Sequence, residues 1–129
     1  MKSITKMTVS VAAAALGLSV AAATPAVAND GDVTRTGNCN GAARTDLTLS
    51  PENRGTMEID FQVDANRRGQ RWEVTMFKSG RRVHQVVRAT RGRSGSFTAH
   101  KLASNRRGLV RVRAVRLGDG QRCTVRARF

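Results

Sequence analysis

The chain has 129 residues, of which 23 are lysine or arginine and nine are aspartate or glutamate, so its net charge is +14 at pH 7. This length suffices for one small domain, and we expect no second one within it. No stretch after residue 28 is apolar enough to cross a bilayer, so we expect no transmembrane span in the mature chain. The positive charge is concentrated in residues 74–129, which hold fifteen basic side chains and one acid, Asp119.

The first 28 residues have the features of a secretory signal. Lys2 and Lys6 form a positive start, residues 9–23 are an apolar run of Ala, Val and Leu, and Ala-Val-Ala at residues 26–28 is a small-residue cleavage site. We expect cleavage after Ala28 and a protein that is secreted or associated with the cell wall. An uncleaved signal that acts as an anchor is the alternative. The mature part keeps 21 basic and nine acidic residues, a net charge of +12.

Residues 29–40 are expected as an N-terminal segment before a single domain at 41–129, and the chain holds two cysteines, Cys39 and Cys123. An even number of cysteines in an exported chain favours a disulfide. Two free thiols or a metal pair are the alternatives, but His84 and His100 lie at no zinc-finger spacing from either cysteine. The sequence therefore predicts one disulfide that closes most of the domain.

From residue 41 onward apolar and polar residues alternate, which is the period-2 pattern of half-buried strands. The alternation predicts seven strands, at residues 43–49, 57–64, 72–76, 83–89, 96–102, 109–117 and 122–129. Seven short strands in about a hundred residues are typical of an all-β, immunoglobulin-like antiparallel sandwich, and a small barrel is the alternative. We expect the strands at 57–64 and 72–76 to form a hairpin.

In an immunoglobulin-like order the last two strands pair with each other and with the strand of Trp72, while the acidic strand at 57–64 lies in the other sheet. Val110 and Val115 have opposite parity, and a bulge near Ala114 would reconcile them. One sheet face would then be rich in arginine. We predict a polyanion-binding surface made of Arg111, Arg113, Arg116, Arg122, Arg126 and Arg128.

Asn-Arg-Arg-Gly occurs twice, at residues 66–69 and 105–108. Asn at the first and Gly at the fourth position suit a type I turn, so we interpret both copies as turns. In the expected strand order they lie at opposite ends of the domain, which argues against one shared site.

The arginine-rich face predicts binding of an anionic envelope component or another polyanion by a monomer. The chain has no tyrosine and a single tryptophan, which argues against sequence-specific recognition of nucleic acid because aromatic stacking platforms are missing. A charged coat that only keeps the protein in solution is one alternative, and arginine supplied by codon usage is another. A secreted protein-interaction or inhibitory module is the second functional hypothesis.

A cationic nuclease or toxin is the third hypothesis. His84 or His100 would act as acid or base with Glu58 or Glu73 as partner. The small secreted guanyl-specific ribonucleases share the size, export and cysteine pair but have a helix and active-site tyrosines that this sequence lacks. No nucleophile elbow, zinc signature or phosphate loop is present, so we assign no catalytic residue, metal or cofactor.

An alanine-rich signal is followed by Cys39, a central strand tryptophan, Trp72, the stretch Ser-Gly-Ser-Phe at 94–97 and Gly-x-x-Cys at 120–123. This layout resembles the small exported β-sandwich proteins of actinobacteria. The resemblance implies a sandwich fold and names no ligand. Antibody domains differ, because their cysteines bridge inner strands and they carry a tyrosine corner.

Overall fold

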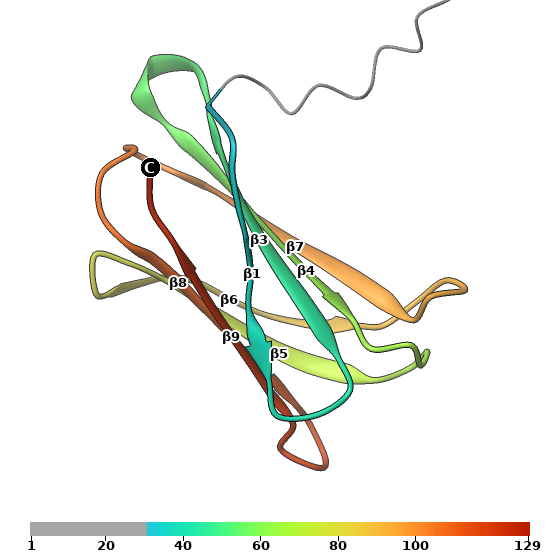
Figure 1. Cartoon of the computed structure of the whole chain (residues 1–129). Helices are drawn as coiled ribbons and strands as arrows, with labels where there is room; N and C mark the ends of the chain where they lie inside the picture. The colour runs from blue at the N-terminus through green and yellow to red at the C-terminus, as the bar shows by residue number, and fades with distance from the viewer. Residues whose placement is uncertain (1–30) are drawn as a thin grey trace, which may run out of the picture.

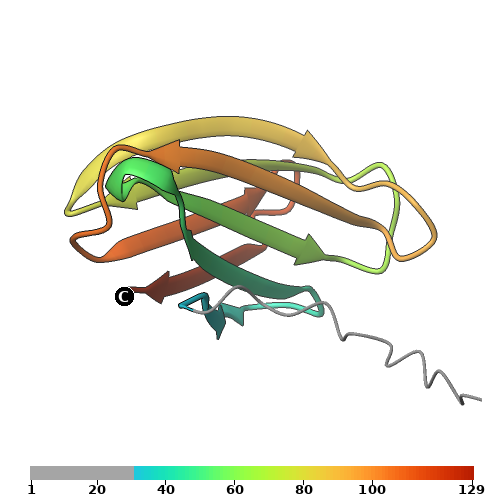
Figure 2. The ribbon, with the colours of Figure 1, turned by 90° about the horizontal axis from the view of Figure 1, so that it is seen from above.

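The computed structural model describes residues 31–129, which form two antiparallel sheets packed against each other (Figures 1 and 2). One sheet has the order β1-β3-β4-β7, with strands Val33–Thr36, Arg44–Pro51, Met57–Asp64 and Ser96–Ala103. The other has the order β2-β9-β8-β5-β6, with strands Asn38–Cys39, Arg122–Ala127, Val110–Arg116, Arg71–Lys78 and Arg81–Ala89. The predicted secretory signal at 1–28 lies outside the described residues.

The predicted immunoglobulin-like sandwich is confirmed, and each of the seven predicted strands is present as β3 to β9. The two final strands, β8 and β9, pair with each other, and β8 pairs with the Trp72 strand, β5. The acidic strand, β4, lies in the opposite sheet. Among residues 31–129 there is no helix of sufficient length and hydrophobicity to span a bilayer.

The predicted hairpin between β4 and β5 is wrong. β4 pairs with β3 and β7, and β5 pairs with β6 and β8, so residues 65–70 carry the chain from one sheet to the other. Asn66 has a left-handed backbone (φ 54°), and its N–H donates to the Asp64 carboxylate at 3.1 Å. Alternation shows that both strands bury one face, but it does not tell whether neighbouring strands share a sheet or face each other across the core.

The segment expected to precede the domain contains two short strands. β1 pairs with β3 and β2 pairs with β9, so the chain changes sheets at Gly37. A Cβ atom at Gly37 would lie 2.4 Å from the Thr124 carbonyl oxygen and 2.7 Å from Thr45 Cγ2. Only glycine permits this close approach, which lets one short segment cover an edge of each sheet.

The core lies between the sheets and is filled by the alternating apolar residues of β3, β4, β5, β7, β8 and β9. Trp72 and Phe61 are fully buried, and the Phe97 ring centroid lies 6.4 Å from each of theirs. Trp72 Nε1 donates to Gln70 Oε1 at 3.2 Å, so the buried indole has a polar partner. The predicted disulfide between Cys39 and Cys123 is confirmed and joins β2 to β9.

Candidate anion-binding face

The outer surface of the β2-β9-β8-β5-β6 sheet is built by strict alternation on β8 and β9. On β8 the side chains of Val110, Val112 and Ala114 are fully buried, so the residues between them point outward. β9 behaves in the same way and buries Cys123, Val125 and Ala127. Four of the predicted arginines are therefore exposed on one face: Arg111, Arg113, Arg122 and Arg126.

Arg111 and Arg126 are direct cross-strand partners in the β8–β9 register. On the other side Arg111 is paired with Phe77 of β5, and its guanidinium carbon lies 4.9 Å from the ring centroid, a cation–π geometry. Phe77 is paired in turn with Arg82 of β6. A row of three arginines and one phenylalanine thus crosses four strands, and we call Arg82, Arg111, Arg113, Arg122 and Arg126 the basic face.

The basic face holds little negative charge. Glu73 is the only carboxylate on the five strands of this sheet as described here, and Glu73 Oε1 accepts a hydrogen bond from Gln85 Nε2 at 3.1 Å. Gln85 Oε1 accepts from Arg82 Nη1 at 3.1 Å, so Glu73 reaches an arginine only through the glutamine. Among residues 31–129, no ion pair involves an arginine of the basic face.

Arg82 was missed in the sequence because of an irregularity on β6. The register between β5 and β6 shifts at Met76 and Phe77, so that Arg82 pairs with Phe77 and Val83 becomes the extra residue. Simple alternation across 81–89 places Arg82 with His84, whereas the shift places Arg82 on the same side as Phe77 and Gln85. A one-residue bulge changes which face a side chain joins.

Two predicted arginines stand apart from this face. β8 pairs with β5 and β9 without a register shift, so the bulge expected near Ala114 is absent and Arg116 keeps the inward parity. It lies at the end of the strand, where Arg116 Nη1 donates to Asp119 Oδ2 at 2.8 Å. Arg128 is exposed one residue beyond the end of β9.

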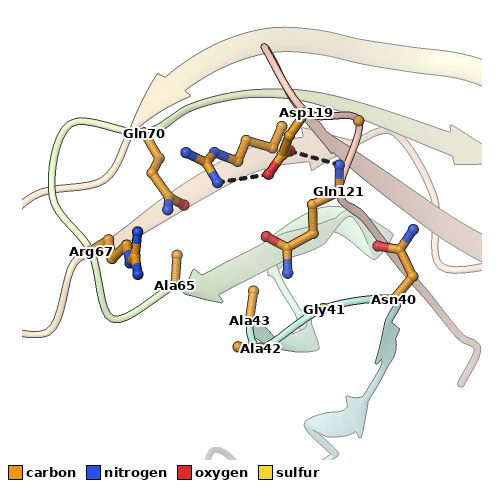
Figure 3. Close-up of a pocket in the computed structure, with 11 residues that line it drawn as sticks. Asn40, Gly41, Ala42, Ala43, Ala65, Arg67, Gln70, Asp119 and Gln121 are labelled. Carbon is orange, nitrogen blue, oxygen red and sulfur yellow. Dashed lines mark hydrogen bonds and ion pairs between the residues drawn. The ribbon is translucent and has the colours of Figure 1, made fainter.

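Arg116 and Asp119 belong to a pocket at one end of the sandwich, which Figure 3 shows between the β4–β5 and β8–β9 connections. Asp119 Oδ1 also accepts the backbone N–H of Gln121 at 2.9 Å, and Gln70 and Arg67 line the other side. The one acid near the Arg116 guanidinium thus neutralises it and closes the β8–β9 turn. Val115, half-buried, takes the outward position that the bulge would have given to Arg116.

The outer surface of the β1-β3-β4-β7 sheet has the opposite charge. Its outward-pointing carboxylates, which we call the acidic face, are those of the exposed Asp46 and Asp64 and the half-buried Glu58 and Asp60. His100 Nδ1 lies 3.7 Å from Glu58 Oε1 and 3.8 Å from Asp60 Oδ1. The three groups are close enough to share a cation, but exposed acidic groups beside an imidazole are common without one and do not by themselves assign a metal.

The two histidines considered for catalysis have different settings. His84 Nε2 is buried without a hydrogen-bond partner, and burial, with Lys101 and Arg88 nearby, lowers the pKa of His84. Glu73 lies on the other side of the sheet, so these two do not meet. His100 does meet Glu58, but 64% of its side chain is exposed on a strand surface. Neither arrangement encloses a substrate.

The two Asn-Arg-Arg-Gly turns lie at opposite ends of the sandwich, as expected, because one follows β4 and the other follows β7 while β4 and β7 are antiparallel. The chain matches no protein-family model, no curated protein and no solved structure. The resemblance to exported actinobacterial sandwich proteins therefore stays a prediction.

Proposed function

We propose that this protein is a non-enzymatic binding module that holds an extended polyanion, such as an anionic polymer of the cell envelope, on its basic face. The observation that carries the proposal is the direct opposition of Arg111 and Arg126, neither of which forms an ion pair with any of residues 31–129. Like charges opposite each other destabilise a sheet. A bound phosphate or carboxylate relieves that repulsion and gains charge-assisted hydrogen bonds from both guanidinium groups.

The spacing of the basic face suits a polymer. Neighbouring strands lie roughly 4.8 Å apart and alternate residues on one strand roughly 6.8 Å apart. Arg126, Arg111 and Arg113 therefore form a flat array of charges at intervals close to those of repeating anionic groups. A flat surface encloses little of a small ligand, but it contacts many repeats of a chain.

Sequence-independent binding is expected. Trp72 is fully buried in the core, and Phe77 is half-buried with the Arg111 guanidinium stacked over it. The basic face thus offers no free aromatic ring on which a nucleic-acid base can stack. Recognition rests on the charge of the polymer backbone, so its affinity falls steeply with salt.

The test is co-sedimentation of the purified protein with isolated cell envelopes, and in parallel retention on duplex DNA as a reference polyanion, each across a salt series. The variant Arg111→Ser/Arg126→Ser removes the opposed pair. The matched control Arg44→Ser/Arg93→Ser loses the same charge at exposed positions off the basic face. On DNA the loss of two phosphate contacts lowers the slope of log affinity against log salt by roughly 1.8.

We expect the control variant to bind almost as the natural protein does and the basic-face variant to lose most of its retention at low salt. Equal losses in the two variants would contradict the proposal and favour a charged coat. Retention on envelopes that resists high salt would also contradict it, since that behaviour indicates a protein partner held by other contacts.

A further inference from the structure

We infer that the protein has a second, discrete anion site at one end of the sandwich, and that it takes a phosphate group carried by a small molecule. The site is a pocket of about 680 Å³ between the β5–β6 turn, the end of β7 and the β7–β8 connection. Of the residues that the structure describes, no acid lines it and four cations do: Lys78, Arg81, Lys101 and Arg107. None of these residues belongs to the basic face, so the inference does not depend on the proposed function.

Lys78 lines the pocket and is the most buried of its four cations. Its side chain lies at the inward parity at the end of β5 and is only 8% exposed. Lys78 Nζ donates to Asn105 Oδ1 at 2.6 Å, and no carboxylate of the described residues pairs with it. An ammonium group has three hydrogen-bond donors, and burying one without a counter-charge is costly. An anion in the pocket supplies that counter-charge.

The other cations reach the pocket from three different segments. Arg81 is the cross-strand partner of Lys78 at the start of β6. Lys101 comes from β7 and Arg107 from the second Asn-Arg-Arg-Gly turn. Within residues 31–129 none of the three forms an ion pair, so all of them can turn toward one ligand. Positive groups that converge without acids between them focus the field on an anion.

The pocket is held in shape before any ligand arrives. The Ser79 backbone N–H donates to the Leu109 carbonyl at 3.0 Å, and Asn105 Oδ1 also accepts the Arg107 backbone N–H at 3.0 Å. Gly108 lies beside the Ser79 side chain and has a left-handed backbone (φ 97°) that side chains rarely adopt, so glycine at this position favours the observed turn. A pre-formed site avoids the entropy cost of ordering its donors on binding.

The lining indicates what kind of molecule carries the phosphate. The volume falls within the usual range of small-ligand sites and exceeds the space that a single phosphate needs. Val83 and Ala103 provide an apolar wall beside the cations. We therefore assign the pocket to a phosphate ester, with the phosphate at Lys78 and its organic part against the apolar wall.

Calorimetric titration of the full chain with inorganic phosphate and with pyrophosphate, at low ionic strength in chloride, tests the site. The variant Lys101→Ser/Arg107→Ser changes exposed residues and keeps the core intact. Lys78→Met removes the buried ammonium while keeping most of its volume. Since hydrogen bonds to charged groups contribute strongly, we expect Lys78→Met to weaken pyrophosphate binding roughly ten- to a hundredfold, and the double variant to weaken it comparably.

The variant Arg44→Ser/Arg93→Ser, which loses the same charge outside both the basic face and the pocket, is the control and should bind pyrophosphate as the natural protein does. Pyrophosphate binding that is lost equally in this control, or kept in Lys101→Ser/Arg107→Ser, would overturn the inference. Thermal unfolding of Lys78→Met identifies a folding defect, in which case the exposed double variant decides. Retention of the pocket variants on cell envelopes reports on the basic face separately, so the two proposals fail independently.

Discussion

The two outer faces of the sandwich are built by the same alternation of inward and outward residues. They differ in the neighbours that surround their charged side chains. On the acidic face three carboxylates have a polar or basic neighbour: Asp46 Oδ1 accepts the Thr36 hydroxyl at 2.8 Å, Asp60 Oδ1 lies 3.8 Å from His100 Nδ1, and Asp64 is the cross-strand partner of Arg44. On the basic face Arg111 lies opposite Arg126, and no ion pair forms there within the described residues.

Charge density alone therefore does not identify a binding surface. Three carboxylates of the acidic face have a hydroxyl, an imidazole or a guanidinium residue as a neighbour. The basic face carries a repulsion that a bound anion relieves, because Glu73, the one carboxylate on the described strands of this sheet, is engaged by Gln85. A ligand binds most favourably where it relieves an existing cost. The pocket at Lys78 follows the same rule, with a buried ammonium in place of opposed arginines.

Removal of the disulfide should change the stability most, and it should affect the two sheets differently. Cys39 and Cys123 both belong to the sheet that carries the basic face, which we call the basic sheet, and the bond joins β2 to β9 there. The sheet that carries the acidic face is the acidic sheet. Replacing both by alanine releases a covalent loop of 85 residues from Cys39 to Cys123, and the loss of chain-entropy stabilisation is about 4 to 5 kcal/mol at most. Urea unfolding of the double variant measures it.

Hydrogen exchange on the same variant measures the loss of amide protection in each sheet separately. Protection at the β2–β9 edge should fall first, while the β3–β4 pairing of the acidic sheet keeps its protection relative to global unfolding. A loss below about 1 kcal/mol would contradict a major stabilising role for the bond. The chain-entropy effect lowers protection in both sheets alike, so an equal loss at the β2–β9 edge and in the β3–β4 pairing would contradict an additional local role of the bond at that edge.

Much of the fold followed from the sequence because each strand buries every second residue. The clean patterns of β4 and β9 gave their faces directly. The alternation could not predict which strands pair with β4, since it is the same whether the next strand is a neighbour in the sheet or lies across the core. β1 and β2 were missed because Val33 and Cys39 are their only apolar residues, and both are edge strands.

The site was predicted in part for related reasons. Arg111, Arg113, Arg122 and Arg126 obey the alternation of fully buried neighbours. Arg116 was misplaced because Val115 was assumed to need burial, whereas a half-buried valine is tolerated on the outer face. The pocket around Lys78 was invisible in the sequence, since its cations come from segments that only the packing of the two sheets brings together.

The opposed arginines should cost stability when no ligand is bound. Arg126→Thr removes one member of the pair, and we expect it to stabilise the free protein by about 0.2–1 kcal/mol at low salt. The mirror change on the acidic face, Asp64→Asn, removes the charge opposite Arg44 and should destabilise by a similar amount while keeping an acceptor for the Asn66 N–H. Denaturant unfolding at low ionic strength measures both.

Arg122→Thr is the matched control, because Arg122 faces Val115 and not another arginine. It should change stability less than Arg126→Thr does. At about 1 M salt, where the Debye length is about 3 Å, the gain in Arg126→Thr should disappear. A gain that persists in high salt, or an equal gain in Arg122→Thr, would show that strand propensity and not cross-strand repulsion is responsible.

The smallest effect is expected from His84, at the border between the two sheets. Its protonation should make the free energy of unfolding depend on pH. Strand β6 packs near β7 at the open edge of the sandwich. Burial, then Lys101 of β7 and Arg88 of β6, lower the pKa of His84 below its ordinary value near 6.5. As pH falls through 6.5 the unfolded chain takes up a proton that the folded protein resists, so the unfolded state gains relative stability.

We therefore expect the free energy of unfolding to decrease between pH 7.5 and pH 5.5, and to decrease less in His84→Gln. His100→Gln is the control for a glutamine placed on a strand. Denaturant unfolding at several pH values in this window measures the slopes, above the range where most carboxylates titrate. Identical slopes in the natural protein and His84→Gln would contradict the assignment, because the buried Nε2 of His84 would then accept its proton as readily in the folded protein as in the unfolded chain.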